Sequence, residues 1–131
     1  MNEKVISTYL KRLGCSPALK GYYLLHRSAV LVLEDPNLLN SITRRLYPML
    51  AAEFMISITS VEKRMRYAIE YAWLNGDYDF ISEIFEYSLS ISKSRPTNRQ
   101  FIYTLAEFIR LEMIFNNGND GTSYNAANYI I

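Results

Sequence analysis

The chain has 131 residues, of which 50% are hydrophobic and 21% are charged, so it can build one globular core and carries too few charges for a disordered chain. With 14 Lys and Arg residues against 13 Asp and Glu residues, the net charge of +1 does not by itself predict a nucleic-acid partner. The single cysteine, Cys15, excludes a disulfide framework and a zinc site built on cysteines, and no apolar run approaches the roughly 20 residues that span a membrane. We therefore expect a soluble cytoplasmic protein with no membrane contact.

The first two predicted helices are bounded by glycine and proline. Apolar residues recur at helical spacing over residues 5–13 and stop at Gly14, a residue type that commonly ends helices. Ser16 followed by Pro17 is typical of a helix start, so a second helix is predicted from there to about residue 33. Because this second segment is apolar on most sides, we expect it at the centre of the core.

The middle of the chain carries the next helix signals. Asp35 and Pro36 repeat the pattern of a cap followed by proline and predict a third helix. Pro48 has to kink or restart that helix, because proline lacks a backbone donor and its ring clashes with the preceding turn. A fourth helix is predicted over about residues 60–73 and is closed near Gly76.

Two further helices and a tail are predicted in the last part of the chain. A fifth helix covers about residues 79–89, and after a loop a sixth begins near Thr97, where Gln100 completes a capping box. The composition then changes to Asn, Gly, Asp and Ser, so residues 116–131 are expected to form a flexible polar tail. The prediction is an all-α, six-helix domain over residues 1–115.

Residues 50–73 carry the spacing of a helix-turn-helix. Ala51 is followed ten positions later by Val61, with a short polar turn between two helical patterns. The small residue lets the two helices cross closely, and the later apolar residue packs the second helix against the first. The turn position that is often Gly or Asn is Met55 in this chain. We therefore predict that the third and fourth helices form a helix-turn-helix.

The predicted fourth helix has two chemically different sides. The apolar side, with three- and four-residue steps, consists of Val61, Met65, Ala68, Ile69 and Ala72. Lys63, Arg66, Tyr67 and Glu70 share the other side. Two cations and an aromatic hydroxyl near the amino end of a helix suit the major groove of DNA, where donors contact guanine and phosphates.

The near-zero net charge hides an uneven distribution. Residues 44–66 contain five cations and two acids, residues 67–92 contain five acids and no cation, and residues 93–99 are basic again. This pattern predicts two basic patches that can straddle a DNA backbone.

Structural roles compete with these DNA-contacting ones. Thr59 and Glu62 have the spacing of a capping box, so Glu62 can satisfy the helix start, accept from a cytosine amine, or do both. A cationic helix face is also most often a solvated face. His26 lies in an apolar segment without a nearby acid or cysteine, so we expect it to be packed or hydrogen-bonded, and we expect Cys15 to be a buried thiol.

Several short motifs agree with one known family. They are Val61-Glu62-Lys63, Arg66, Ala68-Ile69-Glu70, Ala72-Trp73, Pro96-Thr97-Asn98 and Phe101-Ile102. Over about residues 6–114 the chain resembles the C-terminal DNA-binding domains of stage zero sporulation protein A, the sporulation master response regulator of endospore-forming Firmicutes. The resemblance implies six helices, with the third and fourth forming a helix-turn-helix. It also implies binding to short boxes near promoters as tandem subunits, with the fourth helix in the major groove.

The resemblance also implies a set of DNA-binding residues. By position they are Ser60, Glu62, Lys63, Arg64, Arg66 and Tyr67 on the fourth helix, and Arg95, which takes the place of a lysine that contacts the DNA backbone. Ser60 and Lys63 stand where the family usually has arginine. Arg64 replaces an alanine, and Tyr67 replaces a histidine. Because lysine cannot reproduce the planar fork of arginine, we expect the preferred DNA sequence to shift while affinity is kept.

The leading hypothesis is therefore a small DNA-binding transcription regulator of the sporulation type, without a cofactor or a metal. Its expected partners are double-stranded DNA, a second copy bound in tandem, and RNA polymerase. Because only a few residues precede the first helix, we expect no receiver domain and DNA binding that does not depend on phosphorylation. The alternative is a helical interaction module that modulates such a regulator or RNA polymerase without binding DNA. An enzyme is disfavoured, because the chain has one His, one Cys and no glycine-rich phosphate loop.

Overall fold

A computed structural model describes residues 3–85 and 95–117, and every regular element in these two ranges is helical. The elements are α1 (Glu3–Arg12), α2 (Lys20–Glu34), the 3-10 helix η1 (Pro36–Asn40), the π-helical turn η2 (Ile42–Leu46), α3 (Tyr47–Phe54), α4 (Ile58–Asn75), α5 (Tyr78–Phe85) and α6 (Asn98–Asn117). The all-α prediction, with six α-helices, is confirmed for this part of the chain. No helix in these ranges is both long and apolar enough to cross a membrane.

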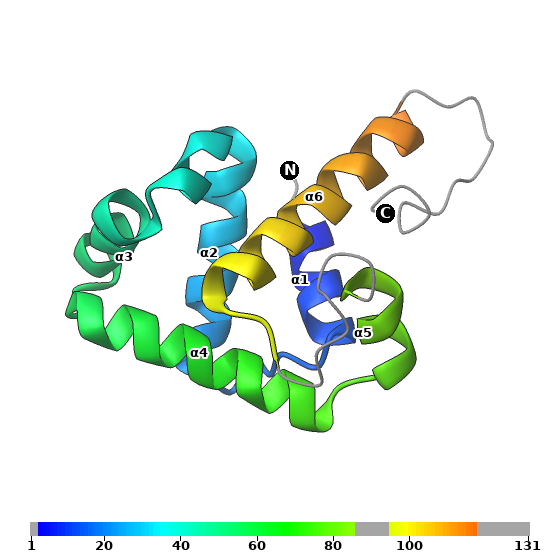
Figure 1. Cartoon of the computed structure of the whole chain (residues 1–131), viewed down its shortest axis with the longest axis horizontal. Coiled ribbons are helices and arrows are strands. Elements are labelled where there is room, and N and C mark those ends of the chain that lie inside the picture. Colours follow the sequence, from blue (N-terminus) through cyan, green and yellow to red (C-terminus); the bar gives the residue numbers. More distant parts are fainter. Residues whose placement is uncertain (1–2, 86–94, 118–131) are drawn as a thin grey trace.

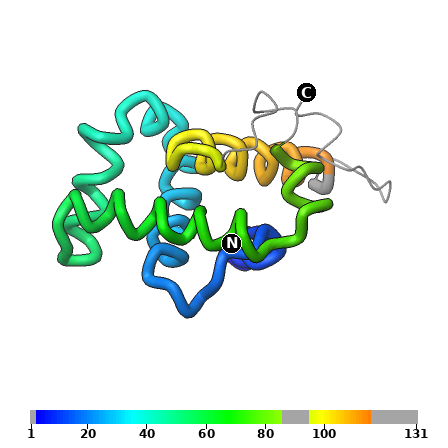
Figure 2. The backbone as a smooth tube through the Cα atoms, turned by 60° about the horizontal axis from the view of Figure 1, so that its bottom comes forward, coloured from blue at the N-terminus to red at the C-terminus, as the bar shows by residue number. Residues whose placement is uncertain are grey.

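Helix α2 is the central element of the fold. In Figures 1 and 2 it runs across both α4 and α6, with α3 at one end of the molecule and α1 and α5 at the other. Its buried side chains include Tyr22, Leu24, Leu25, Ala29 and Val32, which confirms the expectation that this segment lies in the core. Helix α6 contributes Phe101, the largest fully buried side chain among the described residues.

The crossing of α2 and α4 depends on a glycine. A Cβ atom added to Gly21 would lie 2.0 Å from the carbonyl oxygen of Arg64 and 2.8 Å from the Cβ of Ala68. These distances are well inside van der Waals contact, so only a residue without a side chain fits here. The backbones of α2 and α4 therefore approach closely at Gly21, and this contact sets the position of α4.

The start of the second helix was predicted wrongly. Ser16 and Pro17 do not begin α2: Ser16 accepts a hydrogen bond from the backbone N–H of Ala18 at 3.2 Å and closes a single turn. Leu19 is then extended, with φ −95° and ψ 138°, and α2 begins at Lys20. The cap signal at Ser16 therefore closes one isolated turn, which the extended Leu19 separates from α2.

The third predicted helix is divided into three pieces. Asp35 caps η1 as predicted, since its carboxylate accepts from the backbone N–H of Asn37 at 3.1 Å. The chain then forms the π-helical turn, in which the N–H of Tyr47 bonds to the carbonyl of Ile42. Pro48 lies in the first turn of α3, where its missing N–H costs little, so it restarts the helix.

The amino-terminal cap of α4 also differs from the prediction. Ser57, not Thr59, is the N-cap residue, and its hydroxyl accepts from the N–H of Ser60 at 3.0 Å. The helix therefore begins at Ile58, and the predicted capping box of Thr59 with Glu62 is wrong. Because Glu62 lies beyond the cap, its carboxylate is free to pair elsewhere. The predicted stop is confirmed, since Gly76 is the C-cap residue.

The ends of the last two helices were predicted in part. Asp77 caps α5 by accepting from the N–H of Asp79 at 3.0 Å, and the rest of the predicted fifth helix lies outside the described residues. The capping box of α6 is confirmed: Thr97 N–H donates to Gln100 Oε1 at 2.9 Å, and Gln100 N–H donates to Thr97 Oγ1 at 3.1 Å. Residues 116 and 117, expected to begin the polar tail, are helical, and residues 118–131 lie outside the described residues.

Met55 ends α3 in a left-handed conformation, with φ 58° and ψ 46°, and its side chain is 88% exposed. Replacing it with glycine should raise the free energy of unfolding by about 1 kcal/mol, because glycine adopts this conformation without steric cost and little burial is lost. Chemical denaturation measures the change. Ala52→Gly, on the exposed side of α3, is the control and should lower stability by about 0.5–1 kcal/mol. A loss of stability in Met55→Gly would contradict the strain at this turn.

Candidate nucleic-acid interface

Helix α4 separates its apolar and polar side chains as predicted. Val61, Met65, Ala68, Ile69 and Ala72 are all buried, with at most 1% of their surface exposed. Lys63, Arg66 and Tyr67 are exposed, Tyr67 at 57%. No other described segment covers these three side chains, so one side of α4 anchors the helix and the other is accessible.

A tight turn places α4 against α3. The carbonyl oxygen of Ala51 accepts hydrogen bonds from the N–H groups of both Met55 and Ile56, the latter at 3.1 Å. Ser57 then caps α4, and Val61 packs in the core with no exposed surface. The two helices thus pack against each other while the polar side of α4 stays free.

Two predicted site residues have structural contacts. The hydroxyl of Ser60 accepts from the hydroxyl of Ser57 at 3.0 Å, so it belongs to the helix cap. The backbone carbonyl of Arg64 lies under Gly21, where α2 crosses α4, and the Arg64 residue is half-buried. Both residues flank the exposed face and neither lies at its centre.

Glu62 and Arg66 form an ion pair one turn apart on α4. Arg66 Nη1 lies 2.6 Å from Glu62 Oε2, and both side chains remain partly exposed. The carboxylate therefore orients the guanidinium along the helix surface. The remaining guanidinium donors of Arg66 are available to another acceptor.

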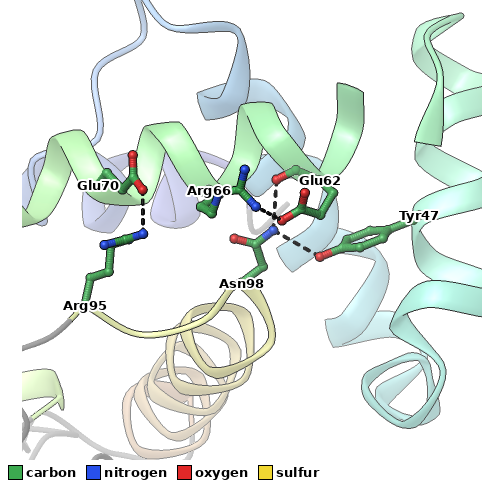
Figure 3. Close-up of polar contacts among 6 residues, drawn as sticks. All are labelled: Tyr47, Glu62, Arg66, Glu70, Arg95 and Asn98. Carbon is green, nitrogen blue, oxygen red and sulfur yellow. Dashed lines mark hydrogen bonds and ion pairs between the residues drawn. The ribbon is translucent and has the colours of Figure 1, made fainter. Parts of the chain in front are cut away.

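Arg95 is brought to α4 from a distant part of the sequence. Its Nη2 lies 2.6 Å from Oε2 of Glu70, and the side chains are 44% and 34% exposed (Figure 3). The structure therefore brings together Arg66, Arg95 and the two acids of α4 along one edge of the helix. Sequence reasoning placed Arg95 among the DNA contacts but missed its pairing with Glu70.

Asn98, the first residue of α6, joins three helices. Its Nδ2 donates to the hydroxyl of Tyr47 on α3 at 3.0 Å and to the backbone carbonyl of Glu62 on α4 at 3.1 Å (Figure 3). Asn98 is 8% exposed, so these bonds are shielded from water. Burial raises the pKa of Tyr47, and the hydrogen bond from Asn98 opposes that rise only in part.

No role was predicted for Asn98, although two signals marked it. It follows the capping residue Thr97, and it belongs to the Pro-Thr-Asn motif. Neither signal identifies its partners, because Tyr47 and Glu62 lie far from it in the sequence.

Two residues outside this face have the structural roles that we expected. His26 Nε2 is hydrogen-bonded to the backbone carbonyl of Glu3 at 2.9 Å. Cys15 is buried, and burial raises the pKa of its thiol to about 12, so it stays protonated at neutral pH. Within the described residues, no three His, Cys, Asp or Glu side chains are grouped closely enough to hold a metal ion.

Comparison with known protein families places most of the chain in one family. The family model for the C terminus of sporulation initiation factor Spo0A matches residues 6–109, which is most of the chain. The chain belongs to the Spo0A C-terminal family. This family is a DNA-binding regulatory domain that acts in transcription and sporulation, and it is not a known enzyme family. The resemblance drawn from the motifs of α4 and from Pro96-Thr97-Asn98 is therefore confirmed.

Proposed function

We propose that this Spo0A C-terminal domain is a non-catalytic, sequence-specific transcription regulator that inserts α4 into the major groove of DNA. The observation that supports this best is the exposed polar face of α4. Arg95, from the segment before α6, lies beside this face and pairs with Glu70. In this arrangement α3 and α4 act as the helix-turn-helix, and the chain acts in the cytoplasm. Residues 1–115 form the DNA-binding domain.

The roles follow from side-chain chemistry. Lys63 and Arg66 donate to guanine edges or nearby phosphates, and Tyr67 presents a hydroxyl to the groove. Glu62 accepts from a cytosine amine through the oxygen that Arg66 does not occupy. Arg95, at the side of α4, reaches a phosphate on the groove edge. Ser60 and Arg64 make secondary contacts at the margins of the face.

Selection from a random duplex library, followed by fluorescence-anisotropy titration, tests the proposed function. A preferred box, bound more tightly than a scrambled duplex of the same length, is the expected result. Binding to two adjacent boxes tests the prediction of tandem subunits. If the chain binds neither the single box nor the two adjacent boxes, the interaction module becomes the better hypothesis. Contact with RNA polymerase would then be tested directly.

Arg66→Ala should weaken binding to the preferred box by about 1–3 kcal/mol, because a base contact is lost. Its binding to scrambled DNA should weaken less. Arg99→Ala is the matched control: its Nε donates to the carbonyl of Leu39 at 2.9 Å, away from α4. Arg99→Ala should weaken binding to the preferred and the scrambled duplex slightly and equally. Equal losses on both duplexes for Arg66→Ala would reject its base-reading role.

A further inference from the structure

Two of the three arginines expected to contact DNA, Arg66 and Arg95, are each paired with an acid of α4. Arg66 is paired with Glu62 and Arg95 with Glu70, each at 2.6 Å. The first pair joins neighbouring turns of one helix and is common on any helix surface. The second joins α4 to the segment before α6, so it depends on the tertiary fold (Figure 3).

The backbone next to Arg95 is held by contacts that do not involve Glu70. The backbone three residues beyond it is fixed by the two bonds of Asn98 to α3 and α4. The capping box of Thr97 and Gln100 fixes the turn into α6. Removing the charge of Glu70 would therefore leave the backbone near Arg95 in place and the charge of its guanidinium uncompensated.

We propose that Glu70 is a specificity-determining residue that restrains binding to DNA of the wrong sequence. The inference rests on the proposed function. In the free protein the carboxylate of Glu70 is paired with the guanidinium of Arg95. An exposed ion pair of this kind is weak enough for a closely placed phosphate to displace the carboxylate. On the preferred box, base contacts by α4 bring a DNA phosphate close enough to Arg95 to displace the carboxylate.

On other sequences the fit is looser, and Arg95 stays with Glu70. Binding to such DNA comes almost entirely from phosphate attraction, so each neutralised cation weakens it. Glu70 thus removes one phosphate contact from the non-specific complex and leaves that contact available in the specific one.

The test compares Glu70→Gln with the wild-type chain on the preferred box and on a scrambled duplex at several salt concentrations. The variant should bind the scrambled duplex about tenfold more tightly at about 0.1 M salt, with a salt dependence steeper by about 0.9. Its affinity for the preferred box should rise less, with an unchanged salt dependence, so its preference for the box falls. Adding Arg95→Ala to the variant should abolish the gain on scrambled DNA.

Glu107→Gln is the matched control, because Glu107 also pairs with an arginine, Arg110, at 2.8 Å on α6. It should leave the preference for the box unchanged. The same gain in Glu107→Gln would reduce the effect to net charge and overturn the proposal, as would weaker binding of Glu70→Gln to scrambled DNA. If the wild-type chain preferred no sequence, the proposed function would fail, whereas the scrambled duplex would still decide whether Glu70 restrains Arg95.

Discussion

Gly21→Ala is expected to lower the free energy of unfolding by about 3 kcal/mol or more and to abolish DNA binding. The new Cβ would lie 2.0 Å from the carbonyl oxygen of Arg64 and 2.7 Å from its carbonyl carbon. Both atoms belong to the backbone of α4, so the clash can be relieved only by moving one helix against the other. Chemical denaturation gives the stability change, and anisotropy titration gives the loss of binding.

The sign of this effect distinguishes packing from helix propensity. Within an unobstructed helix, replacing glycine with alanine would raise stability by about 0.5–1 kcal/mol. Ala68→Gly in the Gly21→Ala background should give no rescue, because the nearest obstacle is the carbonyl of Arg64 and not the Ala68 side chain. A more stable Gly21→Ala variant would mean that α2 and α4 are further apart than described.

Asn98→Leu is expected to lower the free energy of unfolding by about 1–3 kcal/mol, because it leaves the buried hydroxyl of Tyr47 without its donor. The loss should be smaller in a Tyr47→Phe background, where that hydroxyl is already absent. A double-mutant cycle by chemical denaturation measures the difference. Asn75→Ala, which removes an exposed bond to the carbonyl of Tyr71, is the control and should change stability by at most about 0.5 kcal/mol. Additive losses in the cycle would show that Asn98 and Tyr47 do not interact.

The helix ends that could be predicted from the sequence are those set by local capping. Asp35, Gly76 and the pair of Thr97 and Gln100 act where the sequence places them, because each acts on residues within one helical turn. The start of α4 was misplaced because Thr59 and Glu62 have the spacing of a capping box, whereas Ser57 has no acid three residues later. The structure uses Ser57 as the cap all the same.

Tertiary contacts explain what could not be predicted. The close approach of α2 to α4 at Gly21 joins residues more than 40 positions apart, which no local signal encodes. Helical periodicity predicted which side of α4 is exposed. It could not predict that Glu70 pairs with Arg95, because that pair joins elements whose distance is set by the whole core.

The anchoring of α4 by Asn98 has a consequence for the order of events during synthesis. Helix α6 is the last described helix to leave the ribosome, and it carries both Asn98 and the core residue Phe101. Until α6 docks, the hydroxyl of Tyr47 on α3 and the carbonyl of Glu62 on α4 lack the donor that joins them. A nascent chain that ends before residue 98 thus already has every predicted base-contacting side chain, but it does not yet have the side chain that joins α4 to α3.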